Sequence, residues 1–308
     1  MDLNIHEKKF FIAEFNENLT KENKSYYRFV LYDANSKQYN GVMFNIKDMS
    51  YKPSKGDIVL LNGVLQQYNG QMQLKILEIK KTDDAKTEDF IPKSSYDIEN
   101  MFISLKKIVF DNLKNEKLIA LCTRFFNDTE VVNKFKKIPA AKTIHHAYMG
   151  GLLEHTLSIV KLAVIMSHHY SNYVNRDLLI VGALFHDLGK IYELDLTEGI
   201  AYSTTGRLVG HLLIGIEKVN EYIQDIEGFS VGLKDLIIHM IASHHGFLEY
   251  GSPQKPKTFE ALVLYYIDDL DAKINTISNI FNREGIEEGW TSYDKLLERQ
   301  LFKHNIED

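Results

Sequence analysis

The sequence predicts a two-domain α+β protein in which a small, closed barrel of five strands precedes an all-helical domain. The first 80 of the 308 residues contain short runs rich in β-branched and aromatic residues, separated by turn signals. Residues 81–96 are polar, contain a proline and lack periodicity, as linkers do. From Asp97 onward, apolar residues recur at helical spacing. We therefore predict a barrel domain at 1–80, a linker at 81–96 and a helical domain at 97–308.

The predicted strands follow one another closely. KKFFIAEF (8–15) mixes apolar and polar positions, and YYRFVLYDANSKQYNGVMFN (26–45) predicts two strands joined by a polar turn. GDIVLLNGVLQQYNGQMQLKILEIK (56–80) predicts a hairpin around Asn69-Gly70, the strongest short hairpin signal. Gly63 inside its first strand predicts a bulge or a sharp bend. About five short strands in this length suit a small closed barrel.

Composition excludes several classes of protein. The single cysteine, Cys122, excludes a disulfide framework and a cysteine zinc site, and it fits a reducing cytoplasm. The start, MDLNIHEKKFF, does not resemble a signal peptide, and the longest apolar run, LLIVGALF (178–185), is too short to span a bilayer. We therefore expect a cytoplasmic protein without a membrane segment.

Charge and histidine are unevenly distributed along the chain. Residues 1–96 carry 14 basic and 13 acidic side chains, whereas residues 144–308 carry 13 basic and 23 acidic ones. Eleven of the 12 histidines lie after position 144. Acidic clusters repel phosphates unless cations lie among them. The two halves are therefore expected to have different chemistry.

Histidine and aspartate side chains occur at the edges of five predicted helices. The helix DLLIVGALFHDLGK (177–190), for example, is apolar until it presents His186 and Asp187 at its last turn. A single residue of this kind is more often a core or capping residue than a metal ligand. Here five helices present them at intervals of 23 to 33 residues. The residues, in chain order, are His155, His186-Asp187, His211, His244-His245 and the group Asp268, Asp269 and Asp271. This order predicts a shared metal site.

The order of these residues resembles the HD-domain metal-dependent phosphohydrolases over roughly residues 143–275. The motifs that carry the resemblance are HHAYMGGLLEHT, ALFHDLGK, GH, SHHG and YYIDDLDA. The preceding segment resembles an OB-fold, chiefly in GDIVLLNGVLQQYNGQMQLKI. In this combination the whole chain is similar to the YhaM-type 3′–5′ exoribonucleases, in which HHAYMGGLLEHTL and SHHGFLEYGSPQKP are expected.

The resemblance implies one ion held by His155, His186, Asp187 and Asp268. The resemblance favours Asp268 over Asp269, because Asp268 precedes the LDA turn as the family's final aspartate does. His211, His244 and His245 would extend the site to a second ion that Asp187 bridges. Imidazole and carboxylate ligands favour divalent transition metals. We expect manganese first, with iron, nickel, zinc and cobalt as alternatives.

The resemblance also implies roles in catalysis and in substrate binding. Asp187 and Lys190 would be catalytic, since Lys190 matches the lysine of HDxxK and would face a phosphate. His145 and His146 fit contacts to substrate or leaving group, and a simple role in helix entry fits equally well. OB-folds bind single strands through aromatic rings and basic side chains, and we expect Arg28 and Tyr68 to be surface contacts.

The implied activity is release of nucleoside 5′-monophosphates from the 3′ end of single-stranded RNA. Single-stranded DNA and a homo-oligomeric state both stay open. Other interpretations also stay open: hydrolysis of free or cyclic nucleotides with a regulatory barrel, oxygen activation at two irons, or a non-enzymatic nucleic-acid adaptor with a structural metal. GFLEYGSPQKP lacks the Gly-Tyr-Pro triplet of cyclic-dinucleotide phosphodiesterases, which disfavours cyclic dinucleotides.

Overall fold

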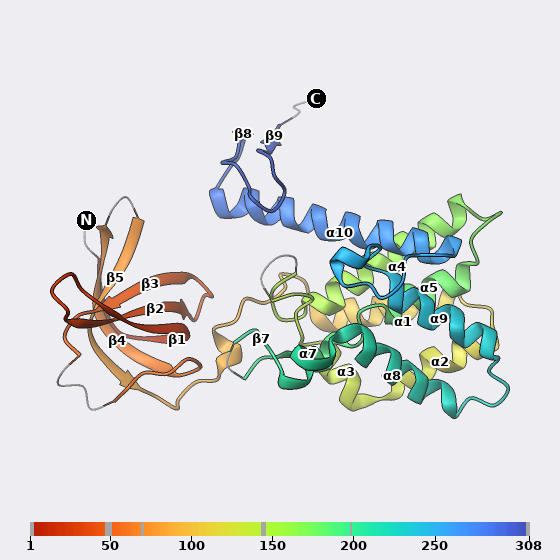
Figure 1. Ribbon diagram of the computed structural model, residues 1–308, viewed down its shortest axis with the longest axis horizontal. Helices are drawn as coiled ribbons and strands as arrows, with labels where there is room; N and C mark the ends of the chain where they lie inside the picture. The colour runs from red at the N-terminus through yellow and green to blue at the C-terminus, as the bar shows by residue number, and fades with distance from the viewer. Residues whose placement is uncertain (1–2, 47–50, 69–70, 143–145, 198, 306–308) are drawn as a thin grey trace. The chain divides into compact units, whose positions relative to one another are not determined.

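The structure is a computed structural model that describes residues 3–46, 51–68, 71–142, 146–197 and 199–305. The chain forms two compact units, and Figure 1 labels most of their elements. The barrel unit comprises Met1–Lys93 and Leu194–Tyr202, and the helical unit comprises Ser94–Glu193 and Ser203–Asp308. The domain boundaries derived from the sequence, at 80 and 96, stay predictions.

Five strands form the wall of the barrel unit. They are β1 Leu3–Leu19, β2 Ser25–Asp33, β3 Gln38–Met43, β4 Ile58–Tyr68 and β5 Gln71–Lys81. They close in the order β1-β2-β3-β5-β4, with β3 and β5 parallel and the other neighbours antiparallel. Inward-facing residues such as Phe10, Phe29, Leu61 and Leu74 fill the interior. The predicted five-stranded, OB-like barrel is confirmed.

Two strand signals have clear structural outcomes. The register of β4 and β5 shifts between Asn62 and Gly63, which confirms the predicted irregularity at Gly63. The predicted Asn69-Gly70 turn lies outside the described residues, but β4 and β5 pair antiparallel from Tyr68 and Gln71 onward. The turn between β2 and β3 is held by the buried carboxylate of Asp33, which accepts hydrogen bonds from the backbone N–H groups of Asn35 and Lys37.

The helical unit is a bundle around one central helix. Its helices are α1 Ile98–Asn112, α2 Glu116–Asn127, α3 Thr129–Phe135, α4 Gly151–His169, α5 Arg176–Phe185, α6 Lys190–Glu193, α7 Thr204–Val209, α8 His211–Gln224, α9 Val231–Ser243 and α10 Phe259–Glu284. All residues of α5 from Asp177 to Phe185 are buried, and this helix packs against α4, α9 and α10. The predicted helical domain is confirmed.

Short strands and capping residues complete the elements. A two-residue pair, β8 Gly289–Trp290 and β9 Phe302–Lys303, follows α10. In the barrel unit, the short 3-10 helix η1 Thr87–Asp89 follows β5, and β6 Leu194–Asp195 pairs with β7 Ala201–Tyr202. Side-chain caps such as Asn175 before α5 and Thr258 before α10 satisfy the first backbone N–H groups of those helices.

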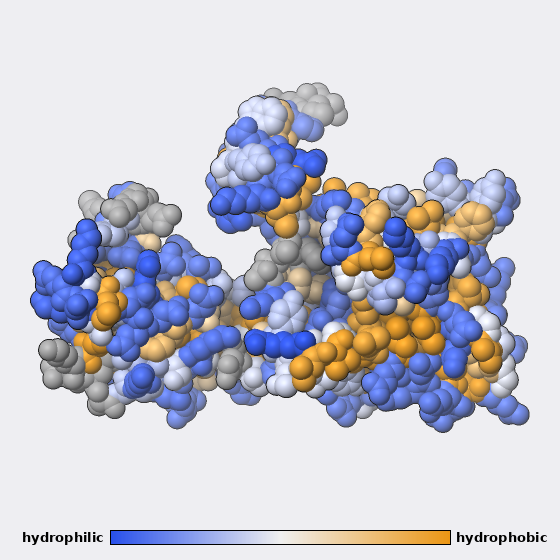
Figure 2. Space-filling model, viewed as in Figure 1, coloured by the Kyte–Doolittle hydropathy of each residue, from blue (hydrophilic) through white to orange (hydrophobic). Residues whose placement is uncertain are grey.

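The surfaces of both units mix hydrophilic and hydrophobic residues, with the larger hydrophobic areas on the helical unit (Figure 2). Leu208, Leu213 and Phe247 are among its exposed apolar side chains. None of the helices in the described ranges is long and apolar enough to cross a membrane.

Candidate metal centre

One group of ligand atoms forms where α4, the end of α5 and α10 meet. His155 Nε2, from α4, lies 3.1 Å from Asp268 Oδ1 of α10 and 3.2 Å from His186 Nε2. His186 and Asp187 follow the last residue of α5, and His186 Nε2 lies 3.3 Å from Asp187 Oδ2. His155 and His186 are fully buried. Two imidazoles and two carboxylates therefore point at one small volume.

A second group forms at the start of α8 and the end of α9. His211 Nε2 lies 3.2 Å from His245 Nε2, and Asp187 Oδ1 lies 3.4 Å from His244 Nε2 and 3.7 Å from His211 Nε2. Gly189 makes this approach possible, because a Cβ at that position would lie 2.0 Å from the carbonyl oxygen of His211. Two imidazoles, those of His211 and His244, thus face Asp187 Oδ1, and the third, His245, lies against His211.

Asp187 joins the two groups. Its Oδ2 faces His186 and His155 and accepts a hydrogen bond from Lys190 Nζ at 2.6 Å. Its Oδ1 is buried and accepts no hydrogen bond from any residue that the structure describes. A buried carboxylate oxygen without a donor is costly unless a cation compensates it. The imidazole and carboxylate atoms around Asp187 fit a divalent transition metal.

A second layer of hydrogen bonds orients all five imidazoles. Each Nδ1 lies 2.8–3.0 Å from an oxygen: Asp271 for His155, Ala183 for His186, Glu193 for His211, Ile241 for His244 and Tyr250 for His245. In the neutral form of each ring these acceptors favour a proton on Nδ1, which leaves the lone pair of Nε2 for a metal.

The charges of the two groups differ. For His155, burial lowers the pKa but the hydrogen bonds to Asp268 and Asp271 outweigh burial and raise it to about 9. The two carboxylates thus stabilise positive charge at this position. Either the protonated ring or a bound divalent ion supplies that charge. In contrast, burial and the neighbouring His244 and His211 lower the pKa of His245 to about 3. A neutral imidazole is the form that binds metal.

The two carboxylates predicted as ligands, Asp187 and Asp268, both have lowered pKa values. Burial would raise the pKa of Asp187, but Lys190 and His186 lower it well below its ordinary value. The hydrogen bond from His155 and the charge of His186 likewise hold the pKa of Asp268 below its ordinary value against burial. Anionic oxygen is therefore present in both groups.

The structure separates the neighbouring aspartates of α10. Asp268 faces His155, whereas Asp269 forms an ion pair with Lys273 at 2.7 Å. Asp271 lies behind the first group, where it accepts hydrogen bonds from His155, His146 and Ser158. The ligand role of Asp268 stays a prediction that this geometry supports.

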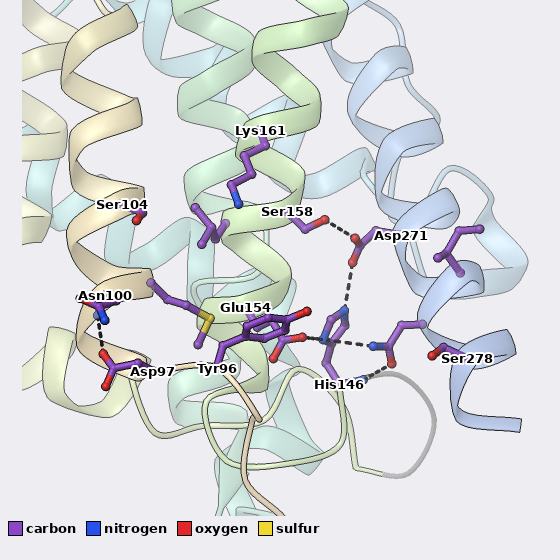
Figure 3. Close-up of a pocket in the computed structure, with 14 residues that line it drawn as sticks. Tyr96, Asp97, Asn100, Ser104, His146, Glu154, Ser158, Lys161, Asp271 and Ser278 are labelled. Carbon is purple, nitrogen blue, oxygen red and sulfur yellow. Dashed lines mark hydrogen bonds and ion pairs between the residues drawn. The ribbon is translucent and has the colours of Figure 1, made fainter. Parts of the chain in front are cut away.

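The predicted substrate contact His146 lines a cavity of about 670 Å³ (Figure 3). Its Nε2 lies 3.0 Å from Asp271 Oδ2, and its backbone N–H donates to Asn275. Tyr96 and Lys161 also line this cavity. His146 therefore supports Asp271 from behind the first ligand group, and contact with substrate stays a prediction. His145 lies outside the described residues.

Arg28 and Tyr68, the predicted strand contacts, line one cavity of about 550 Å³ in the barrel unit. Both are exposed, and Tyr68 is 57% exposed. Glu14 and Glu17 line the same cavity, so its charge is mixed. The structure brings the two residues together, and their function stays a prediction.

Sequence analysis named Asp271 without its orienting role, and it missed the other acceptors that orient the imidazoles. Asp271 follows Asp268 by three positions and Glu193 follows Lys190 by three, so each pair shares a helical face. That spacing was the available signal for a second layer. The carbonyl acceptors Ala183, Ile241 and Tyr250 have no sequence signal, because any residue has a carbonyl group.

An OB-like barrel followed by a helical unit with these clustered imidazoles and carboxylates defines an HD-type hydrolase. Residues 152–273 match the HD domain family. Over 231 residues the chain is 34% identical to the 3′-5′ exoribonuclease YhaM of Geobacillus sp. (strain WCH70), an alignment that covers 73% of this chain and 69% of that protein. The chain belongs to the YhaM 3′–5′ exoribonuclease family.

Proposed function

We propose that this protein is a metal-dependent 3′–5′ exoribonuclease that releases nucleoside 5′-monophosphates from single-stranded RNA. One observation carries the proposal: the buried carboxylate of Asp187 presents one oxygen to each of two ligand groups. Such an arrangement fits two divalent ions that act on one phosphodiester. Family membership supports the direction and the strand, and single-stranded DNA is the alternative substrate.

The proposed ligands are those of the two groups. His155, His186, Asp187 and Asp268 hold one ion, and Asp187, His211, His244 and His245 hold the other. When bound, such ions activate water at neutral pH and stabilise the charge of the phosphate in the transition state. Manganese is the ion that we propose first. The partial exposure of His211, His245 and Asp268 leaves the centre accessible from one side, as catalysis requires.

The chain itself supplies orientation and charge. Nδ1 hydrogen bonds hold each imidazole, and Lys190 Nζ lies against Asp187 Oδ2, where its charge stabilises a non-bridging phosphate oxygen. In the reaction, the oxygen of water bonds to the last phosphorus and the bond from that phosphorus to the upstream O3′ breaks. The proton passes to O3′, which leaves a shortened strand with a 3′-hydroxyl and a free 5′-monophosphate.

The barrel unit is proposed to hold the strand upstream of its 3′ end. Arg28 would contact a phosphate and Tyr68 a base, which raises the local concentration of the 3′ end at the metal centre. The single cysteine fits a cytoplasmic site of action. A homo-oligomer stays a prediction.

The proposal is tested with single-stranded RNA labelled at the 5′ or the 3′ end, with and without Mn²⁺. The 5′-labelled strand should give a ladder that shortens with time, and the 3′-labelled strand should give only labelled mononucleotide. Asp187→Asn should abolish both products and reduce bound metal at both positions.

Controls separate the remaining alternatives. A strand with a blocked 3′ end should resist degradation, whereas internal cuts or indifference to the block would refute the exonuclease. Faster turnover of cyclic or free nucleotides than of strands would favour the regulatory interpretation of the barrel. Full metal occupancy without any hydrolysis would favour the structural-metal adaptor.

A further inference from the structure

A group of aromatic rings lies beside the metal centre without taking part in it. We call Phe247, Tyr250, Tyr265 and Tyr266 the aromatic platform. The ring of Phe247 lies 5.9 Å from that of Tyr250 and 5.8 Å from that of Tyr265, and the rings of Tyr265 and Tyr266 are 4.9 Å apart. Phe247 is 43% exposed, Tyr250 67% and Tyr266 60%. The rings form one contiguous surface that solvent reaches.

The aromatic platform adjoins both ligand groups. Phe247 follows His245 by two residues, and His245 Nδ1 hydrogen-bonds the carbonyl oxygen of Tyr250. Tyr265 precedes Asp268 by three residues on α10, so the two side chains share one helical face. The platform therefore connects a residue of the second group with a residue of the first.

The local backbone holds the platform in place. Gly246 has a φ of +78°, and a Cβ there would lie 2.3 Å from the ring of Tyr265, so only glycine lets the ring pack against this turn. The hydroxyl of Ser252, which is buried, donates to the carbonyl oxygen of Ala242 at 2.9 Å. The turn after α9, which includes His244 and His245, is thus fixed to the end of that helix.

We propose that the aromatic platform stacks the nucleobase at the 3′ end of the strand and so positions the terminal phosphodiester at the metal centre. This inference rests on the proposed exonuclease function. Every base has a π-face, so stacking on rings tolerates any sequence, as an exonuclease that removes each 3′ nucleotide in turn requires. The metal ligands contact phosphate only, and the platform supplies the contact to the base.

The first experiment measures stacking without catalysis. The metal-loaded protein is mixed with an RNA whose terminal linkage is a hydrolysis-resistant phosphorothioate and whose 3′ base is the fluorescent 2-aminopurine. Binding should quench the fluorescence, and Phe247→Ala should remove most of the quenching. The matched control is Tyr173→Ala, an aromatic that is 64% exposed elsewhere on the helical unit and should quench as the wild type does.

The second experiment measures hydrolysis. The kcat/KM of the wild-type protein should be about 10-fold to 100-fold lower on a strand with an abasic 3′ terminus than on the natural strand. This is the range expected for one stacked base. Phe247→Ala should reduce kcat/KM on the natural strand by a similar factor. On the abasic strand the substitution should cause no further reduction in kcat/KM. Tyr266→Ala, a second substitution at an exposed ring of the platform, should lower kcat/KM on the natural strand and leave kcat/KM on the abasic strand unchanged.

The outcomes distinguish this inference from the proposed function. Equal rates on abasic and natural strands, with quenching unaffected by Phe247→Ala, overturn the platform and leave the exonuclease standing. Absence of hydrolysis on every strand, with quenching at the 3′ base that Phe247→Ala removes, overturns the exonuclease and leaves the platform standing. Absence of both overturns both.

Discussion

Asp268 and Asp269 are adjacent in the sequence, yet one faces two buried imidazoles and the other an exposed lysine. Asp268→Asn should lower bound metal and reduce RNA hydrolysis by more than ~100-fold, because loss of a ligand exceeds the 10-fold to 100-fold cost of losing an outer partner. Asp269→Asn is the matched control. It should change the free energy of unfolding by less than about 0.5 kcal/mol, because only an exposed ion pair is lost. Bound metal and the rate of strand hydrolysis are measured for both variants. Equal effects of the two substitutions would refute the ligand role of Asp268.

We expect Asp271 to affect metal binding through its hydrogen bond with His155. Asp271→Asn keeps the shape of the side chain but removes the charge that His155 Nδ1 faces at 2.8 Å. Metal affinity should fall about 10-fold to 100-fold, and excess metal should restore hydrolysis. Metal titration monitored by activity makes this measurement. If saturating metal failed to rescue the variant, Asp271 would have a direct role in the reaction.

Among the elements, the β2–β3 turn depends on one carboxylate. Asp33 is 2% exposed and accepts hydrogen bonds from Asn35, Lys37, Tyr39 and Lys8, the last at 2.7 Å. Burial would raise its pKa, but the hydrogen bonds from Lys8 and from the backbone of Lys37 and Asn35 lower it. Because the folded pKa is below the unfolded one, this carboxylate stabilises the barrel above pH ~4 and loses that effect as the pH falls.

Asp33→Asn should therefore destabilise the barrel by about 2 kcal/mol at pH 7, as expected for hydrogen bonds to a charged group. The difference in unfolding free energy between wild type and variant should shrink as the pH falls below the ordinary pKa of a carboxyl and through the lowered folded-state pKa, where the wild-type carboxyl also becomes neutral. Hydrogen exchange of peptides from β1, β2 and β3 in a urea series measures the stability difference between wild type and variant at each pH. A difference that grew at low pH would contradict the prediction.

Sequence predicted the elements better than their supporting contacts. The barrel was predictable because alternation and the Asn69-Gly70 signal are local, and the five ligand-bearing helices because their apolar faces are periodic. What joins the ligand groups is not local: Asp187 and His211 meet only because Gly189 lies against the start of α8. Which oxygen of Asp187 faces which group depends on packing between helices, which spacing along the chain does not contain.

For the whole molecule, we predict that strand capture and cleavage are separable. The double variant Arg28→Ala/Tyr68→Ala should bind long strands more weakly. Dinucleotides are too short to contact the barrel and should be hydrolysed as before. One lost base contact accounts for ~1–3 kcal/mol, most of it in KM. Leu77→Ala, at an exposed position of β5 outside the cavity, is the matched control.

Salt provides an independent check of the same division. Capture of long strands by the wild type should weaken as salt rises, because phosphate contacts release counterions, and the double variant should show a shallower salt slope. The measurement is the activity ratio between long strands and dinucleotides across a salt series. An unchanged ratio would remove the Arg28 and Tyr68 cavity from capture.

The segment Leu194–Tyr202 belongs to the barrel unit although the chain before and after it belongs to the helical unit. The hydroxyl of Thr87 bonds the carbonyl oxygen of Thr197, and β6 pairs with β7 inside this segment. The polypeptide therefore passes from one unit to the other three times, at Lys93, Glu193 and Tyr202. A chimera in which the barrel is replaced at one junction would keep the segment Leu194–Tyr202 but lose the barrel residues that this segment contacts. A functional chimera of this protein must therefore transfer the segment together with the barrel.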